Sequence, residues 1–257
     1  MYKRQEKGLL HLEAGENVGF VKSFEWLIAN GGEADYYAFS DQDDVWLPNK
    51  IERTLAKIKE REKQLGKATP IVVFTDAKLV NGALEPIHDS FFGYNGLNTN
   101  KTDLPHLLIE NKVIGCTTMF NRAVQDKMTS FPVNARYHDW WIALIGATFG
   151  EVSYLDEPTL LYRQHGNNVV GAKNFISYVW SRVKDMKAQG ESLIENERQA
   201  WEFYEIYKDI LMEEQQRILQ NFANIHSVNW FERVARLFQY GFWKSGKVRN
   251  IGVFLMI

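Results

Sequence analysis

The sequence predicts an α/β fold, in which a mostly parallel sheet is flanked by helices and followed by a helical C-terminal extension. Residues 34–40 and 70–80 have the aromatic or β-branched composition of buried strands. Between them, residues 49–66 carry apolar side chains at helical spacing. A strand, a helix and a second strand in this order form a parallel crossover unit. Beyond residue 171, the pattern changes to that of long helices.

Helix signals lie on both sides of the first strand. Residues 20–30 have apolar side chains at helical spacing, and Gly31 and Gly32 supply a C-terminal stop. After the strand, Pro48 suits the first turn of the helix over residues 49–66. The apolar stripe of that helix consists of Ile51, Leu55 and Ile58.

The next part of the chain predicts a long excursion and then regular elements. Residues 81–105 are rich in Gly, Asn, Asp and aromatic residues with weak periodicity, so we expect an irregular segment that carries substrate contacts. Residues 112–128 predict a strand and a helix, and residues 138–150 predict an apolar helix. Residues 151–166 predict two short strands around a proline-bearing turn. One long C-terminal helix is expected to carry Ile194, Trp201, Tyr204, Leu211, Ile218 and Phe222.

Length and composition narrow the functional classes. A chain of 257 residues suffices for one large α/β domain or two small ones. A formal net charge of −2 gives no general electrostatic basis for binding nucleic acid. The single cysteine, Cys116, excludes an internal disulfide and a cysteine-rich zinc site, and it is consistent with the cytoplasm. No apolar run approaches the roughly 20 residues of a spanning helix.

An acidic cluster follows the first predicted strand. Asp41, Asp43 and Asp44 fall within four positions, directly before a helix. One interpretation is a turn whose carboxylates favour the positive end of the helix dipole. The other is a bound cation, because three adjacent carboxylates repel one another unless a positive charge joins them. Oxygen ligands of this kind favour Mg²⁺ or Mn²⁺ over zinc.

A second polar site precedes the apolar helix over residues 138–150. His138 and Asp139 stand at its start, followed by Trp140 and Trp141. Asp139 is either a helix cap or a general base at the mouth of a pocket.

Arg163 and His165 form a third polar site at the end of a predicted strand. They alternate along the chain and therefore lie on the same face. A lone histidine is more often a satisfied surface or core residue than a ligand, but the arginine beside it suits a phosphate. The three sites together suit transfer of a group from a diphosphate-activated donor, with a divalent ion on the diphosphate and a carboxylate as the base.

Four stretches, FSDQDDVWLPNKI, IGCTTMFNRA, HDWWIAL and YLDEPTLLYRQHGNNVVGA, carry a family resemblance in this order. They resemble the family 2 glycosyltransferases, in particular bacterial rhamnosyltransferase-like members that build surface polysaccharides. The resemblance covers roughly residues 12–172. It implies a GT-A (Rossmann-like) fold and an inverting single displacement. It also implies a nucleotide-sugar donor, such as a dTDP- or UDP-sugar, and a glycan or lipid-linked glycan acceptor.

The resemblance also assigns roles to individual residues. Asp41 and Asp43 match the Asp-x-Asp pair that holds the cation and the diphosphate, with Asp43 expected in direct contact with the metal. Asp139 matches the catalytic base, and His165 matches the later ligand that completes the metal site. Secondary contacts to donor or acceptor are expected from Asp44, Trp46, Trp140 and Arg163.

The sequence departs from the family at its N-terminus. Two motifs that grip the base and ribose of the nucleotide, one like Ser/Thr-Tyr-Asn and one like Asp-Asp-Gly-Ser, have no counterpart here. We therefore expect residues 6–172 to be a partial GT-A domain. Such a fragment is expected to expose a sheet edge and to be inactive alone. Residues 1–5, MYKRQ, match what the end of a transposon-based sequencing adaptor encodes, so we expect them to be an adaptor scar.

Residues 173–257 form the predicted helical extension. Within it, residues 230–250 alternate aromatic with basic side chains, which suits either an amphipathic helix on a membrane surface or a helix packed on the domain. The first reading makes the parent protein cytoplasmic and peripheral on the inner face of the plasma membrane. Two alternatives to a glycosyltransferase are a nucleotidyltransferase and a non-catalytic binding module.

Overall fold

The computed structural model describes residues 11–128, 132–164 and 186–257. The chain divides into two compact units, the first ending at Gly32 and the second beginning at Glu33. The first unit contains α2 (Phe20–Asn30), which confirms the first predicted helix. The helix ends where the glycines begin, because Gly32 has a φ of +82°, which departs from helical geometry and favours glycine.

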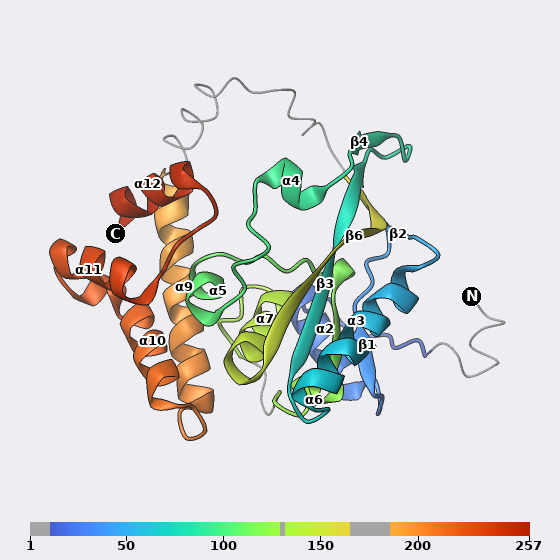
Figure 1. Ribbon diagram of the computed structural model, residues 1–257, viewed down its shortest axis with the longest axis horizontal. Coiled ribbons are helices and arrows are strands. Elements are labelled where there is room, and N and C mark those ends of the chain that lie inside the picture. The colour runs from blue at the N-terminus through green and yellow to red at the C-terminus, as the bar shows by residue number, and fades with distance from the viewer. Residues whose placement is uncertain (1–10, 129–131, 165–185) are drawn as a thin grey trace. The chain divides into compact units, whose positions relative to one another are not determined.

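The second unit is built on a six-stranded mixed sheet (Figure 1). The strand order is β1-β5-β3-β6-β2, and β4 pairs with β3. The strands are β1 (Tyr36–Ala38), β2 (Val45–Trp46), β3 (Ile71–Val80), β4 (Pro86–His88), β5 (Met119–Asn121) and β6 (Glu151–Arg163).

The sequence predicted a mostly parallel sheet, but the sheet in the structure is mixed. Among the described strands, only β3 and β6 pair in parallel, and the other pairings are antiparallel. The crossover from β1 through α3 (Lys50–Leu65) to β3 does leave these two strands pointing the same way. However, β5 lies between them and runs in the opposite direction. Local sequence encodes each strand but not the one that is inserted beside it.

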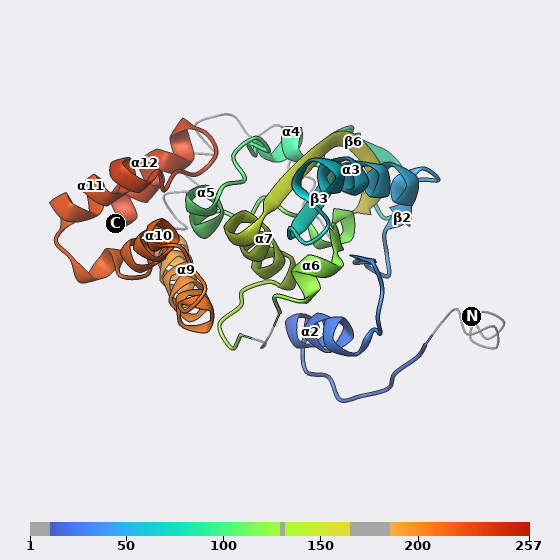
Figure 2. The same cartoon turned by 60° about the horizontal axis from the view of Figure 1, so that its bottom comes forward.

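Two helices cover opposite faces of the central strands, as Figure 2 shows. On one face, Ile71 and Val73 of β3 pack against Ile58 of α3. On the other, a Cβ at Gly146 of α7 (His138–Phe149) would lie 2.8 Å from the Val72 side chain. Because successive side chains of a strand point to opposite faces, β3 is buried on both sides.

The two strands predicted within residues 151–166 form one strand, β6. Its pairing with β3 shifts register on both sides of Asp76, which is opposite Pro158. A register shift of this kind tolerates a proline, which has no N–H for the ladder. The strand therefore continues through the position where the sequence predicted a turn.

The short helices of this unit connect the strands. They are α4 (Phe91–Asn95), α5 (Leu104–Ile109) and α6 (Arg122–Gln125). The long excursion predicted over residues 81–105 thus holds β4, α4 and the beginning of α5.

Four further helices follow, namely α9 (Met186–Tyr207), α10 (Glu213–Ala223), α11 (Trp230–Tyr240) and α12 (Lys247–Met256). The single long helix expected to carry the apolar stripe is in fact two, α9 and α10. The stripe faces the core only in part, because Ile194 and Trp201 are 42% and 44% exposed, whereas Leu211 and Phe222 are buried. The buried face of α9 instead carries Phe203, whose ring centroid lies 5.1 Å from that of Trp141 in α7. Among the described residues, no helix combines the length and apolar character needed to cross a membrane.

Candidate functional site

The candidate site lies where the chain leaves β1 and enters β5. These strands are antiparallel and pair Ala38 with Met119, so the residues after β1 lie beside those before β5. The preceding segment is a 3₁₀ turn, η1 (Gly115–Thr117). Potential ligand atoms of Asp41, Asp44 and Cys116 all lie within 4.8 Å of one another. The sheet thus brings together the acidic cluster and a residue more than seventy positions downstream.

The electrostatics of this cluster fit a divalent cation. Burial, followed by the charges of Asp44 and Asp43, raises the pKa of the Asp41 carboxyl. Asp44 Oδ1 accepts the backbone N–H of Arg163 at 3.0 Å. Its other oxygen, Oδ2, is buried without a hydrogen-bond partner in the described parts of the chain. A buried carboxylate oxygen left in this way is unfavourable, and a cation between Asp41 and Asp44 would satisfy it.

The donor set also bears on which metal fits. Burial and the neighbouring carboxylates raise the pKa of the Cys116 thiol, and a thiol is a softer ligand than the carboxylates beside it. A metal held here by the carboxylate oxygens would most favourably be Mg²⁺ or Mn²⁺. Asp43 does not belong to this cluster within the described residues, and its direct metal contact stays a prediction. His165 lies outside the described residues, so its predicted role stays a prediction too.

Asp139 is anchored to the same 3₁₀ turn as Cys116. Its carboxylate accepts the Gly115 N–H at 2.7 Å and the side-chain amide of Asn111 at 3.1 Å. Gly115 permits this approach, because a Cβ there would lie 2.9 Å from Nε2 of His138 and 3.4 Å from Oδ2 of Asp139. The N-cap of α7 is Tyr137, so the structure does not use Asp139 as the cap that the sequence allowed.

Burial gives Asp139 the pKa of a base that works near neutrality. It raises the pKa of this carboxyl to about 6, although hydrogen bonds from Gly115, Trp140 and Asn111 oppose the shift. The charge of Asp41 raises it further, which indicates that the two carboxylates are close enough to interact. A carboxylate with a pKa near 6 accepts a proton from an attacking hydroxyl more readily than an ordinary aspartate.

Arg163 acts on the acidic loop rather than facing outward. Its Nε donates to the Asp43 carbonyl at 2.8 Å, and one terminal nitrogen donates to the Gly82 carbonyl at 2.7 Å. Together with its backbone bond to Asp44, these contacts fix the path of the loop. The structure therefore supports a positioning role for Arg163, where the sequence predicted a substrate contact.

The two tryptophans predicted as substrate contacts differ. Trp46 is 37% exposed, at the start of the segment that leads into α3. Trp140 is 4% exposed, and its indole N–H donates to the Leu107 carbonyl in α5. The position of Trp140 is that of a core residue and gives no support to a substrate contact.

Lys50 is a residue of the site that the sequence did not single out. It is 2% exposed, and its Nζ donates to the Cys116 carbonyl at 2.8 Å. Burial lowers its pKa to about 8, and interactions with Cys116 and Asp44 oppose the shift. In the sequence it is one of several lysines of an amphipathic helix, and only its place directly after the acidic cluster signals a role.

Comparison with known proteins relates part of the chain to a glycosyltransferase. No family model matches the sequence. The chain is 27% identical over 148 residues to dTDP-rhamnosyl transferase RfbG of Shigella flexneri. The match covers 54% of this chain and 46% of that protein, so the chain spans about half the length of the curated relative it matches. This similarity supports a relationship to glycosyltransferases.

Proposed function

We propose that this chain belongs to an inverting, metal-dependent glycosyltransferase of family 2 with a GT-A fold. It transfers rhamnose or another hexose from a dTDP- or UDP-sugar to a glycan or lipid-linked glycan of a surface polysaccharide. The observation that carries this proposal is the position of Asp139. Its carboxylate has a raised pKa and is tied through Gly115 to the turn that carries Cys116, next to Asp41 and Asp44.

In this proposal, Asp139 binds the acceptor hydroxyl and takes its proton as the oxygen attacks the anomeric carbon. The hydrogen bonds from Gly115 and Asn111 hold the carboxylate in place, so the proton acceptor needs no reorientation. Asp41 and Asp44 would hold a divalent ion, with Asp43 and His165 as further candidates. Such an ion, when bound, neutralises the charge that grows on the leaving diphosphate.

The acidic loop needs a fixed shape for this role, and two cations of the chain support it. Arg163 binds the backbone on the Asp43 side of the loop, and Lys50 binds the Cys116 carbonyl on the other side. Both bonds are to the backbone, so they set the spacing of the carboxylates. Trp46, exposed at the edge of this region, is the remaining candidate for contact with the donor or acceptor.

The proposal extends to a peripheral contact with the membrane through α11 and α12. Phe231 and Phe238 are 78% and 66% exposed, and Ile251 and Leu255 of α12 are also exposed. Aromatic side chains on a helix face suit the interface of a lipid bilayer. The basic side chains of this segment support a membrane contact less. Arg233, for example, donates to the carbonyls of Val228 and His226 and is therefore engaged within the protein.

Product analysis tests the proposed reaction. The full-length parent protein is incubated with dTDP- or UDP-sugars and Mg²⁺ or Mn²⁺, with and without EDTA. Release of a nucleoside diphosphate that EDTA abolishes supports a glycosyltransferase. Release of pyrophosphate supports a nucleotidyltransferase instead, and metal-dependent binding without any product supports a non-catalytic module.

A further inference from the structure

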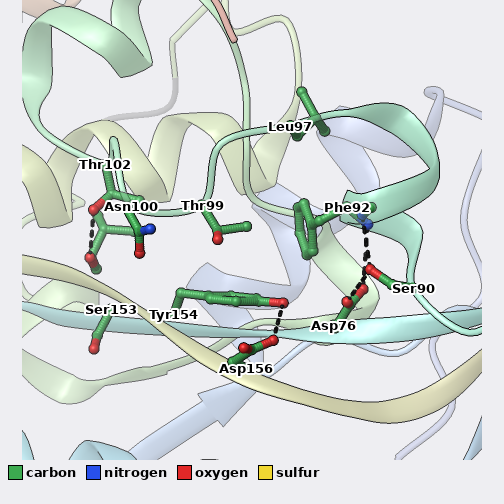
Figure 3. Close-up of a pocket in the computed structure, with 12 residues that line it drawn as sticks. Asp76, Ser90, Phe92, Leu97, Thr99, Asn100, Thr102, Ser153, Tyr154 and Asp156 are labelled. Carbon is green, nitrogen blue, oxygen red and sulfur yellow. Dashed lines mark hydrogen bonds between the residues drawn. The ribbon is translucent and has the colours of Figure 1, made fainter. Parts of the chain in front are cut away.

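A cavity of about 580 Å³ lies between β6 and residues 90–102 (Figure 3). Its lining includes Phe92, Thr99 and Asn100 from the excursion, and Tyr154 and Asp156 from β6. A cavity of this size holds a small organic molecule. It is separate from the group formed by Asp41, Asp44 and Cys116, none of which lines it.

One of the two carboxylates at the cavity is used by the protein itself. Asp76 accepts hydrogen bonds from the Ser90 hydroxyl and from the backbone N–H groups of Ala77 and Phe91. These bonds fix the start of α4 and occupy both oxygens of the carboxylate. Asp76 is therefore a structural residue and offers little to a metal ion.

Other polar groups of the cavity remain available to a ligand. Within the described parts of the chain, no hydrogen bond uses the side chains of Thr99 or Asn100. Asp156 accepts one bond, from the Tyr154 hydroxyl at 3.3 Å, which leaves its second oxygen open. Figure 3 shows Thr99 and Asn100 on one side of the Tyr154 ring and Asp156 on the other. Donors and acceptors thus surround an aromatic ring.

The lining excludes some ligand classes. None of the described residues around the cavity is a lysine, arginine or histidine, whereas two are aspartates. A phosphate or a carboxylate in the ligand would meet negative charge without a compensating cation. The ligand is therefore uncharged or positively charged at this end.

Aromatic rings beside hydroxyl and amide groups suit a sugar. The rings of Phe92 and Tyr154 meet edge to face, with centroids 5.4 Å apart and planes at 79°. Such rings pack against the C–H face of a pyranose, while Asn100 and Thr99, on the same side of the Tyr154 ring (Figure 3), exchange hydrogen bonds with its hydroxyls. We propose that this cavity binds an uncharged sugar unit.

The short helix α4 places this cavity next to the candidate site. Phe91 packs on Tyr162, with ring centroids 5.6 Å apart, and on the buried cluster that contains Cys116. The next residue, Phe92, lines the cavity. We therefore assign the bound sugar to the acceptor glycan, as a unit close to the sugar that reacts. This assignment rests on the proposed function, whereas the binding of a sugar to the cavity does not depend on it.

Binding is measured by NMR on the ¹⁵N-labelled full chain, without donor or metal. The probes are methyl rhamnopyranoside and methyl glucopyranoside, with sodium glucuronate as the charged comparison. Either neutral sugar should shift amide signals of residues 90–102 and 152–156, and glucuronate should bind at least about tenfold more weakly because of Asp156. Asp156→Asn should reduce this difference.

Variants locate the binding. Tyr154→Ala should weaken binding at least about tenfold, and Tyr204→Ala, a tyrosine on α9 outside the cavity, should leave it unchanged. Thr99→Ala keeps the test valid if Tyr154→Ala does not fold, and it should also weaken binding. The proposal is overturned if neither neutral sugar shifts the amide signals, or if glucuronate binds as tightly as the neutral sugars. It is also overturned if Tyr154→Ala and Thr99→Ala bind sugar like the wild type. Binding without any transfer activity refutes the proposed reaction and leaves the sugar cavity standing.

Discussion

Burial shifts the pKa values of two adjacent residues, His138 and Asp139, in opposite directions. It lowers the pKa of His138 to about 4 and raises that of Asp139 to about 6. Both shifts favour the uncharged form, as expected for groups taken out of water. The sequence identified both residues as candidates, but their protonation depends on the packing of η1 and Phe39 around them, which local sequence does not encode.

These two shifts make opposite contributions to stability. Between pH 6.5 and about 4, the unfolded chain protonates His138 and the folded chain does not, so stability falls as the pH falls. Between about 6 and 3.8, the folded chain protonates Asp139 and the unfolded chain does not, so stability rises as the pH falls. In the wild type, the two contributions largely cancel between pH 6 and pH 4.

Replacing either His138 or Asp139 should reveal the contribution of the other residue to the pH dependence of stability. As the pH falls from 6 to 4, Asp139→Asn should lose stability relative to the wild type by about 1.4 kcal/mol per pH unit. His138→Phe should gain stability relative to the wild type over the same range. Urea unfolding in EDTA at several pH values measures both. Parallel curves for the wild type and Asp139→Asn would show that Asp139 titrates normally in the folded chain.

At the scale of single elements, the sequence predicted individual helices better than it predicted where an element ends or which element it packs against. The helical periodicity over residues 49–66 and 138–150 corresponds to α3 and α7, because one amphipathic or apolar pattern specifies one helix. The sequence-based prediction of two short strands was wrong at β6, where pairing with β3 carries one strand through Pro158. The prediction of one long helix was also wrong at α9 and α10, where a break at residues 208–212 divides one apparent stripe. Both errors come from tertiary contacts.

The contact between α7 and the sheet predicts opposite effects for the same substitution at two helical glycines. Gly146→Ala should destabilise the protein by about 1–3 kcal/mol, because its Cβ would lie 2.8 Å from Val72 and 2.9 Å from Val152. Gly190→Ala in α9 has no atom within 4 Å of its Cβ. It should stabilise by about 0.5–1 kcal/mol, since alanine favours a helix.

Urea unfolding at one pH measures both glycine variants. A neutral or stabilising Gly146→Ala would mean that the helix and the sheet are farther apart than described.

The exposed faces of α11 and α12 predict binding to lipid. Exchange of Phe231 and Phe238 for serine should reduce co-sedimentation with phosphatidylcholine–phosphatidylglycerol vesicles at least about fivefold. A matched control replaces two other exposed apolar residues, Val133 and Ile210, with serine, and it should bind like the wild type. Equal binding by the two double variants would assign these aromatic residues to something other than a membrane.

For the whole molecule, the sequence predicted the chemical groups of the site but not their framework. Asp41 and Asp139 are almost one hundred positions apart, yet the charge of one raises the pKa of the other. The link between them is η1, whose Gly115 and Cys116 contact the two carboxylates. Antiparallel pairing of β1 and β5 puts that turn in place, and no local pattern indicates this pairing. The family resemblance predicted the roles of these residues, and the pairing of the strands explains why they lie close together.

The long-range packing also explains which predicted contacts lack support. Trp140 lies beside the proposed base in the chain, but the helix directs it toward α5 and away from a ligand. Arg163 leaves the sheet next to the acidic loop and binds its backbone. The burial of Trp140 in the core and the position of Arg163 at the end of β6 decide their contacts.

The central claim is that Asp139 is the proton acceptor in sugar transfer. The most direct test uses the full-length parent protein and compares the wild type with Asp139→Asn and with Asp209→Asn, an exposed aspartate outside the site. For each protein, nucleoside diphosphate release is measured with donor, acceptor and Mg²⁺, and donor affinity is measured by calorimetry. We expect Asp139→Asn to lower the rate by about 10²–10⁴-fold with an unchanged donor affinity, and Asp209→Asn to change neither. Transfer by Asp139→Asn at the wild-type rate would contradict this role.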